Sequence, residues 1–254
     1  MAFLSSLNAR RSSLSYELEL LTLASLLYLY DSTVLLHANE AILTCDRRNV
    51  WRASTGLDGF MIAGRRLCFL NPFTMYQPCT RLLWNMYSPD QPVEDKSWSE
   101  EVKQLRRLAP WTVIAALALF LLLPLGLFTI LGARAILTSV IALYGSILIA
   151  GLLTWRRHLV PGLQGLRLAG FLFECLACPP FGVNLIRRAS LRTQVREPLF
   201  TAATRLLSAA EWDALRARCI ATLDWELGGL EGPSPERQSL EDRRAQLRAW
   251  TMPT

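Results

Sequence analysis

The sequence has little charge and almost no histidine. Of its 254 residues, 19% are charged, and His37 and His158 are the only two histidines. A zinc centre draws its ligands from several closely spaced histidines and cysteines, which two distant histidines do not supply. The sequence also has no G-x-S-x-G nucleophile motif and no glycine-rich phosphate loop. It therefore identifies no catalytic residue, and no cofactor is expected; whether the protein is an enzyme stays open, with a role other than catalysis favoured.

Charge is missing altogether from two long runs. No charged residue lies in 108–133 or in 135–155. The apolar segment 110–131 would be about 33 Å long as a helix, enough to cross a hydrocarbon core. The second segment, 136–154, follows after four residues, a link that allows only an antiparallel helical hairpin. The sequence thus predicts a mainly α-helical, multi-pass integral membrane protein with a transmembrane hairpin over 110–154.

Basic residues are distributed unevenly around this hairpin. Its turn carries Arg134 alone. Its two outer flanks carry Lys96, Lys103, Arg106, Arg107, Arg156, Arg157 and Arg167. Lysine and arginine accumulate on the cytoplasmic side of membrane proteins, so both ends of the hairpin, and with them the N- and C-terminal parts, are expected there. The alternative is that these flanks are basic only because water solvates them.

Small residues line one face of the second hairpin helix. They recur at spacings of three and four, which allows another helix to approach closely. They are Ser139, Ala142, Ser146 and Ala150. The partner is either the other arm of the hairpin, which we favour, or a second copy of the protein.

The N-terminal part, 1–44, contains a hydrophobic helix over 20–37 that is only marginally able to span a membrane. Nine strongly apolar residues contribute about −3 to −5 kcal/mol to insertion, and Asp31 opposes them with about +2.5 to +3.5 kcal/mol. One interpretation makes Asp31 an intramembrane acid on an ion path. We favour the other, in which the helix packs on the cytoplasmic side of the hairpin with Asp31 at a solvated edge.

The segment 155–186 is equally ambiguous. Its apolar stretch 168–186 contains Glu174 and the pair Pro179-Pro180, which oppose a straight span. We expect a membrane-associated or re-entrant element with an interfacial acid, Glu174. The arginines that follow would be attracted to anionic lipid, namely Arg187, Arg188, Arg192 and Arg196.

Two polar regions are expected in the cytosol. In 45–109, apolar runs around Gly64-Arg65 predict a short β-hairpin near 58–70. The part of the chain between residues 38 and 109 carries eight acidic residues beside ten basic ones, which argues against nucleic acid as a partner. In 187–254, Ser208 and Glu211 form a capping box ahead of an amphipathic helix. A final helix should open at Pro235, and this helix pair requires an apolar partner inside or outside the chain.

Six cysteines lie on the expected reducing side and are predicted to be free thiols. Only Cys175-Leu-Ala-Cys178 has a spacing with chemical meaning, and it is a weak metal or redox candidate without a second pair. The leading hypothesis is a membrane-anchored interaction, scaffold or assembly protein whose partners are the lipid bilayer and another protein or a second copy. The alternative is a membrane-bound thiol oxidoreductase or metal-binding protein that uses Cys175 and Cys178.

Overall fold

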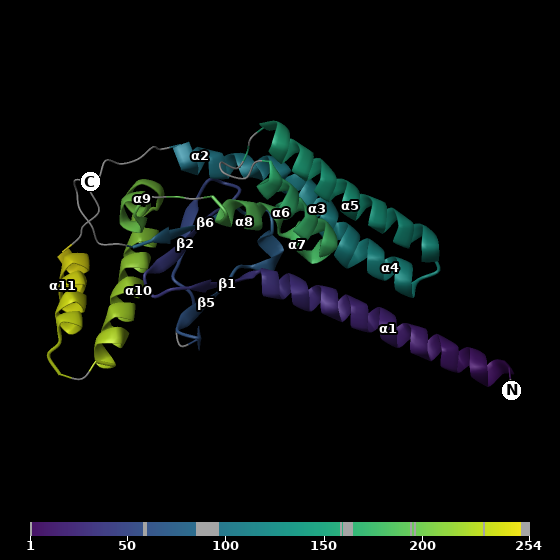
Figure 1. Cartoon of the computed structure of the whole chain (residues 1–254), viewed down its shortest axis with the longest axis horizontal. Helices are drawn as coiled ribbons and strands as arrows, with labels where there is room; N and C mark the ends of the chain where they lie inside the picture. Colours follow the sequence, from purple (N-terminus) through teal and green to yellow (C-terminus); the bar gives the residue numbers. More distant parts are fainter. Residues whose placement is uncertain are drawn as a thin grey trace. The chain divides into compact units, whose positions relative to one another are not determined.

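The computed structural model describes residues 2–57, 60–84, 97–157, 159, 165–193, 195, 197–230 and 232–249, with the backbone alone for 2–15 and 97. Helices dominate, and two small three-stranded sheets accompany them (Figure 1). The chain forms two compact units. Unit 1 comprises Met1–Thr33, Leu70–Tyr76 and Gln104–Thr193, and unit 2 comprises Val34–Phe69, Gln77–Lys103 and Gln194–Thr254.

Unit 1 is helical, and its longest helices are the N-terminal helix and the arms of a hairpin. In chain order its elements are α1 (Ala2–Asp31), the 3-10 turns η1 (Pro72–Thr74) and η2 (Leu105–Leu108), the first hairpin arm α3 (Ala109–Leu117), η3 (Ala118–Leu122) and α4 (Leu123–Phe128), the second arm α5 (Gly132–Arg157), and the short helices α6 (Leu166–Ala177), α7 (Pro179–Val183) and α8 (Leu185–Leu191).

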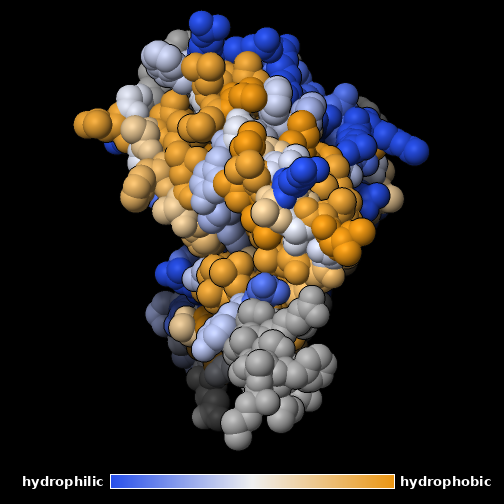
Figure 2. Space-filling view, turned by 90° about the vertical axis from the view of Figure 1, so that its right-hand side faces the viewer, coloured by the Kyte–Doolittle hydropathy of each residue, from blue (hydrophilic) through white to orange (hydrophobic). Residues whose placement is uncertain are grey.

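The predicted helical hairpin is confirmed. Two helical runs, Trp98–Phe128 and Gly132–Arg157, are long and apolar enough to cross a membrane. The arms pack against each other along α3, η3 and α4 on one side and α5 on the other. Figure 2 looks at the end of the molecule that carries the α4–α5 turn, and hydrophobic residues dominate that face.

A π-helical turn interrupts the first arm just before Pro124. Proline cannot donate a backbone hydrogen bond and crowds the preceding turn, so the helix widens to a π turn over Ala118–Leu122. The carbonyl of Ala118 accepts hydrogen bonds from the Leu123 amide and from the hydroxyl of Ser139 in the opposite arm, at 2.7 Å. The irregular turn is therefore tied to the second helix.

Helices α6 and α7 fold back against the hairpin at two glycines. A Cβ atom on Gly151 would lie 2.5 Å from a methyl group of Leu172 in α6. A Cβ on Gly182 in α7 would lie 2.3 Å from the Cδ1 atom of Ile147. An alanine at either position would force the Leu172 or Ile147 side chain to shift. The segment expected to be re-entrant is thus a helical elbow, broken at Pro179, that packs on α5.

Unit 2 contains both sheets and the C-terminal helices. Its strands are β1 (Thr33–Leu36), β2 (Glu40–Cys45), β3 (Trp51–Ser54), β4 (Met61–Ile62), β5 (Arg65–Phe69) and β6 (Cys79–Leu83), and its helices are α2 (Ser97–Gln104), α9 (Leu199–Leu206), α10 (Ala209–Gly228) and α11 (Pro235–Ala249). Strand β4 pairs antiparallel with β5 through Met61–Arg66 and Ile62–Arg65, which confirms the β-hairpin predicted near 58–70.

The expectation of a helix through residue 37, within a helical 1–44, is wrong. Helix α1 ends at Asp31, and β1 and β2 follow it. Strand β2 is the centre of a sheet with the order β3-β2-β6, where Leu43 pairs with Ala53 on one side and Thr80 on the other. The apolar run that continues past Asp31 is buried by strand pairing, not by a helix.

The capped helix α10 finds its apolar partner inside unit 2. The Ser208 hydroxyl accepts from the Glu211 amide, at 3.4 Å, and the Ser234 hydroxyl accepts from the Arg237 amide at the start of α11. Helix α10 packs against β3 and α11. Its Trp212 lies in the core of unit 2, edge-on to Phe200 with ring centroids 5.8 Å apart.

Candidate functional site

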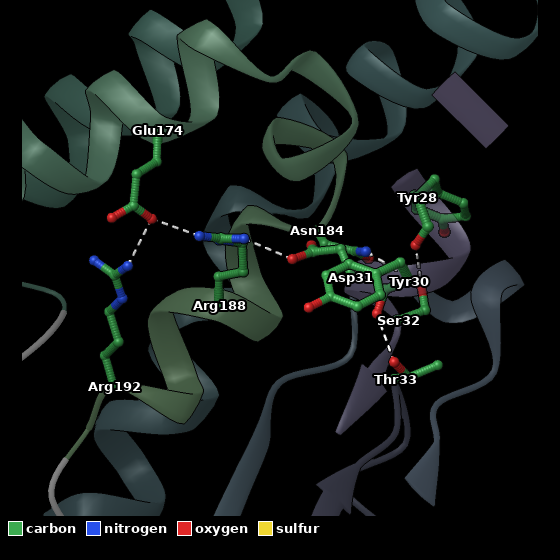
Figure 3. Close-up of polar contacts among 9 residues, drawn as sticks. All are labelled: Tyr28, Tyr30, Asp31, Ser32, Thr33, Glu174, Asn184, Arg188 and Arg192. Atoms are coloured by element: carbon green, nitrogen blue, oxygen red, sulfur yellow. Dashed lines mark hydrogen bonds and ion pairs between the residues drawn. The ribbon is translucent and has the colours of Figure 1, made fainter. Parts of the chain in front are cut away.

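Four charged side chains from three parts of unit 1 meet at the C-terminal end of α1 (Figure 3). We call Asp31, Glu174, Arg188 and Arg192 the ionic cluster. Arg188 donates from Nη1 to Asp31 Oδ1, at 2.6 Å, and from Nη2 to Glu174 Oε2. Arg192 donates to the same Glu174 oxygen at 2.7 Å. Arg188 therefore links the end of α1 to α6.

Local helical geometry explains how the two arginines reach one carboxylate. Arg188 lies in α8, and Arg192 is the residue that follows this helix after Leu191. A spacing of four places both side chains on the same helical face. Each guanidinium also lies over an aromatic ring, Arg188 over Phe181 at 4.3 Å and Arg192 over Phe171 at 4.8 Å. Aromatic faces attract cations, so these rings help to hold the arginines.

Burial is uneven across the ionic cluster. The side chains of Asp31 and Arg188 are 9% and 19% exposed, whereas those of Arg192 and Glu174 are 36% and 44% exposed. Burial raises the pKa of the Asp31 carboxyl, and the charge of Arg188 opposes this shift. The Asp31–Arg188 pair is thus the desolvated part of the cluster, where an unpaired charge would be most costly.

Neutral hydrogen bonds extend the cluster to the residue after α1. The Asn184 amide donates to the Ser32 hydroxyl at 3.2 Å, and that hydroxyl donates to the Tyr28 carbonyl at 2.9 Å. The Leu70 amide donates to the Ser32 carbonyl at 2.9 Å. These bonds fix the point where the chain leaves α1.

A second buried arginine holds the 70–76 segment. The Arg187 guanidinium donates to the Asn71 carbonyl and to the Thr74 hydroxyl, the latter at 3.1 Å. The Tyr28 hydroxyl donates to the Pro72 carbonyl in the same segment. Unit 1 is therefore assembled around polar contacts between parts of the chain that lie far apart in sequence.

The expectation that Arg187 and Arg188 face anionic lipid is wrong. Arg187 is buried, and Arg188 is largely enclosed by its pairing with Asp31 and Glu174. Arg192 is partly exposed and also pairs with Glu174, while Arg196 lies outside the described residues. The carboxylates of Asp31 and Glu174 hold Arg188 inside the protein, and the Asn71 carbonyl and Thr74 hydroxyl hold Arg187 there.

The Cys175 thiol lies in an apolar setting. It is buried in the core that α6 and α7 share with the hairpin, and burial raises its pKa to about 12. Burial also raises the pKa of Cys178, which is half-buried at the elbow between α6 and α7. Within the part of the chain that the structure describes, no cluster of histidine, cysteine and acidic side chains could hold a metal ion.

The small-residue face of α5 lies inside unit 1. Ser139, Ser146 and Ala150 are buried, and Ala142 packs against the same core. The Ser139 hydroxyl donates to the first arm of the hairpin, and the Ser146 hydroxyl donates to the Leu143 carbonyl in its own helix. The structure thus places this face against neighbouring helices of the same chain.

No family model, curated protein or solved structure matches this chain. Its site must therefore be interpreted from its own residues. Sequence reasoning identified Asp31 and Glu174 and missed their partner Arg188, as well as Asn184. No local pattern connects them, because Arg188 is 157 residues from Asp31. The ionic cluster joins helices and presents no oriented nucleophile, so its arrangement is that of a structural clasp.

Proposed function

We propose that this protein is a membrane-anchored scaffold. In this proposal the hairpin of α3, η3, α4 and α5 crosses the bilayer with both ends on the cytoplasmic side. Unit 2 is the part that binds a protein partner. The observation that carries the first half is the apolar outer surface of the hairpin, and an exposed apolar patch in unit 2 carries the second.

The outward side chains of the hairpin are apolar along both arms. Exposed apolar positions run from Ile114 to Phe128 in the first arm and from Leu137 to Trp155 in the second. A surface of this length and composition suits acyl chains better than water. Two hydroxyls of α5 bond within their own helix. Thr138 donates to the Arg134 carbonyl, and Thr154 donates to the Ala150 carbonyl. In a bilayer, polar groups must be satisfied internally.

The lysines and arginines support the proposed sidedness. Lys103, Arg106 and Arg107 precede the first arm, and Arg156 and Arg157 end the second, while the turn holds Arg134 alone. Reporter fusions after residues 105, 134 and 160 test this arrangement. We expect cytoplasmic signals at 105 and 160 and a signal from the opposite side at 134. Equal signals at 105 and 134 would overturn the hairpin topology.

The partner-binding half rests on the β4–β5 hairpin of unit 2. Five large apolar side chains in or next to this hairpin are exposed, and we call them the hairpin patch: Leu57, Phe60, Met61, Ile62 and Phe69. Aromatic residues and methionine are enriched in protein interfaces, and contiguous exposed apolar patches mark interaction sites. Helix α10 no longer requires an external partner, so the hairpin patch is the surface that does.

Pull-down from gently solubilised membranes tests this half. The double variant Phe60→Ser, Ile62→Ser should lose co-purifying protein, because two large apolar side chains leave the interface. The matched control is Trp225→Ser, which removes an equally exposed aromatic side chain from α10 in the same unit. Retention of every partner by the double variant, or equal loss in both variants, would contradict the assignment.

The Cys175 environment favours this proposal over a thiol oxidoreductase. A reactive cysteine needs a lowered pKa, and that of Cys175 is raised to about 12. At pH 8 its thiolate fraction should be about a thousandfold below that of an ordinary thiol, and iodoacetamide should alkylate it correspondingly slowly. Alkylation of Cys175 in the folded protein at the rate of an unfolded control would restore the redox hypothesis.

A further inference from the structure

We infer that α1 is a third lipid-embedded helix, surrounded by acyl chains over residues 20–30. This inference rests on the proposed membrane anchorage of the hairpin and extends it to a helix whose sequence is only marginally apolar. Four observations on α1 carry it: the distribution of its exposed side chains, the pairing of its hydroxyls, the neutralisation of its terminal acid and its attachment to the hairpin.

Large apolar side chains project from more than half of the circumference of α1. Leu18, Leu20, Leu23 and Leu26 are each 57% to 60% exposed. At about 100° per residue they cover an arc of about 200°, and Leu20 and Leu29 point in opposite directions. A helix that lies on a protein or at a membrane surface keeps one polar face, whereas a helix that is apolar all round is surrounded by apolar material.

Two exposed hydroxyls of α1, those of Thr22 and Ser25, bond to their own helix. Thr22 donates to the Leu18 carbonyl at 2.7 Å, and Ser25 donates to the Leu21 carbonyl at 2.9 Å. Thr138 makes the same bond in α5, at 2.8 Å. Side chains that bond to the carbonyl four residues earlier need no water, which is what an acyl-chain environment requires.

The charge at the end of α1 is neutralised inside the protein. Asp31 pairs with Arg188, and residues 20–30 carry no charge. This uncharged stretch would extend about 16 Å along the helix axis. Glu17 and Glu19 lie beyond it, about 18 to 21 Å from Asp31. The lipid-embedded stretch is therefore bounded by acidic residues at both ends.

The attached end of α1 shares the core of the hairpin. The ring of Tyr28 lies against Phe120 in the first arm, with centroids 5.0 Å apart, and Tyr28 belongs to the same buried cluster as Leu119 and Ile147. From this contact α1 extends toward the same side of unit 1 as the α4–α5 turn (Figure 1). Helix α1 is thus attached to the hairpin through Tyr28 and extends on the side of the hairpin turn.

Photocrosslinking in native membranes tests the inference. A benzophenone amino acid is placed at Leu20 or at Leu29, on opposite sides of α1, and irradiated protein is analysed by mass spectrometry for phospholipid adducts. The positive control is position 148, an exposed leucine of α5. The negative control is position 243, an exposed arginine of α11 in unit 2.

We expect phospholipid adducts at 20, 29 and 148 and none at 243. Adducts at only one of positions 20 and 29 would describe a helix lying at the membrane surface, and would overturn the inference. Crosslinked dimers, or adducts with another protein, at 20 and 29 would overturn it in favour of a protein partner. If 148 also lacks lipid adducts, the proposed anchorage fails. If 148 alone carries them, the anchorage stands and only the inference about α1 fails.

Discussion

The two units differ in the side chains that they expose and in the contacts that join their elements. Unit 2 encloses aromatic rings such as Trp84, Phe200 and Trp212, and the outward side of its last helix is polar. Unit 1 turns leucines outward along α1 and α5 and places two acids and three arginines among its contacts between helices. The proposed anchorage accounts for this difference, because it surrounds the hairpin of unit 1 with acyl chains and leaves unit 2 outside the bilayer.

Buried ion pairs nevertheless occur in both units. In unit 2, the carboxylate of Glu197 is 1% exposed and accepts from the Trp98 indole and from Arg205, the latter at 2.7 Å. That pair links α9 to a residue eight positions away in sequence. The ionic cluster of unit 1 joins segments more than 150 residues apart. In unit 2 the ion pair joins residues that are close in sequence. In unit 1 the ion pairs also join distant segments and so help to fix how the helices pack.

The largest expected effect is a loss of stability in unit 2 alone, caused by the removal of a buried aromatic ring. Phe200 lies between Trp84 and Trp212, with centroids 6.0 and 5.8 Å away. Phe200→Ala should lower the free energy of unfolding of unit 2 by about 3–5 kcal/mol. Limited proteolysis of membranes should then degrade unit 2 while the hairpin stays in the pellet. The control Phe173→Ala removes an exposed ring of α6 and should change little; loss of both units together in Phe200→Ala would contradict their independence.

The Asp31–Arg188 pair is expected to have the next largest effect. Arg188→Met leaves a buried carboxylate without its partner, which should destabilise unit 1 by about 3 kcal/mol. The double variant Asp31→Asn, Arg188→Met removes both charges and should recover much of that loss. Melting temperatures in mild detergent measure the difference. A double variant no more stable than Arg188→Met would show that charge pairing is not the cause.

The contact between α7 and α5 gives a smaller, steric effect. Gly182→Ala forces a methyl group against Ile147 and should cost about 1–3 kcal/mol through overpacking. Gly145→Ala in α5 is the matched control, because its Cβ would meet no atom within 4 Å. We expect Gly145→Ala to leave the melting temperature unchanged or to raise it. Equal effects of the two variants would place α7 away from the hairpin.

The exposed edge of the ionic cluster should matter least. Arg192 is 36% exposed, so its bond to Glu174 is weakened by solvent. Arg192→Met should destabilise unit 1 by less than about 1 kcal/mol. A loss as large as that of Arg188→Met would mean that the outer half of the cluster is desolvated by something that covers it in the membrane.

Local patterns predicted the elements that depend on neighbouring residues. The hairpin followed from two uncharged runs, and the β4–β5 turn followed from Gly64 between apolar residues. Ser208 and Pro235 marked the beginnings of α10 and α11. Each of these signals lies in one continuous stretch of chain, where periodicity and capping act directly.

Non-local pairing explains what the sequence did not reveal. Strand β2 depends on β6, which lies almost forty residues later, where Leu43 meets Thr80. Without that partner, 33–45 reads as a continuation of the apolar helix. Arg188 likewise reads as one of several basic residues near a membrane until Asp31 and Glu174 are brought beside it. Both errors concern partners that only the folded chain supplies.

Asp31 and Arg188 are far apart in sequence, so Asp31 is synthesised long before its partner. Asp31 leaves the ribosome 157 residues before Arg188. At about 5–20 residues per second, that interval is roughly 8 to 30 s. During this time the apolar helix α1 carries an acid with no arginine partner, while the hairpin is already being made. Newly made α1 must therefore wait in water, at the insertion machinery or on a chaperone before α8 arrives to hold it.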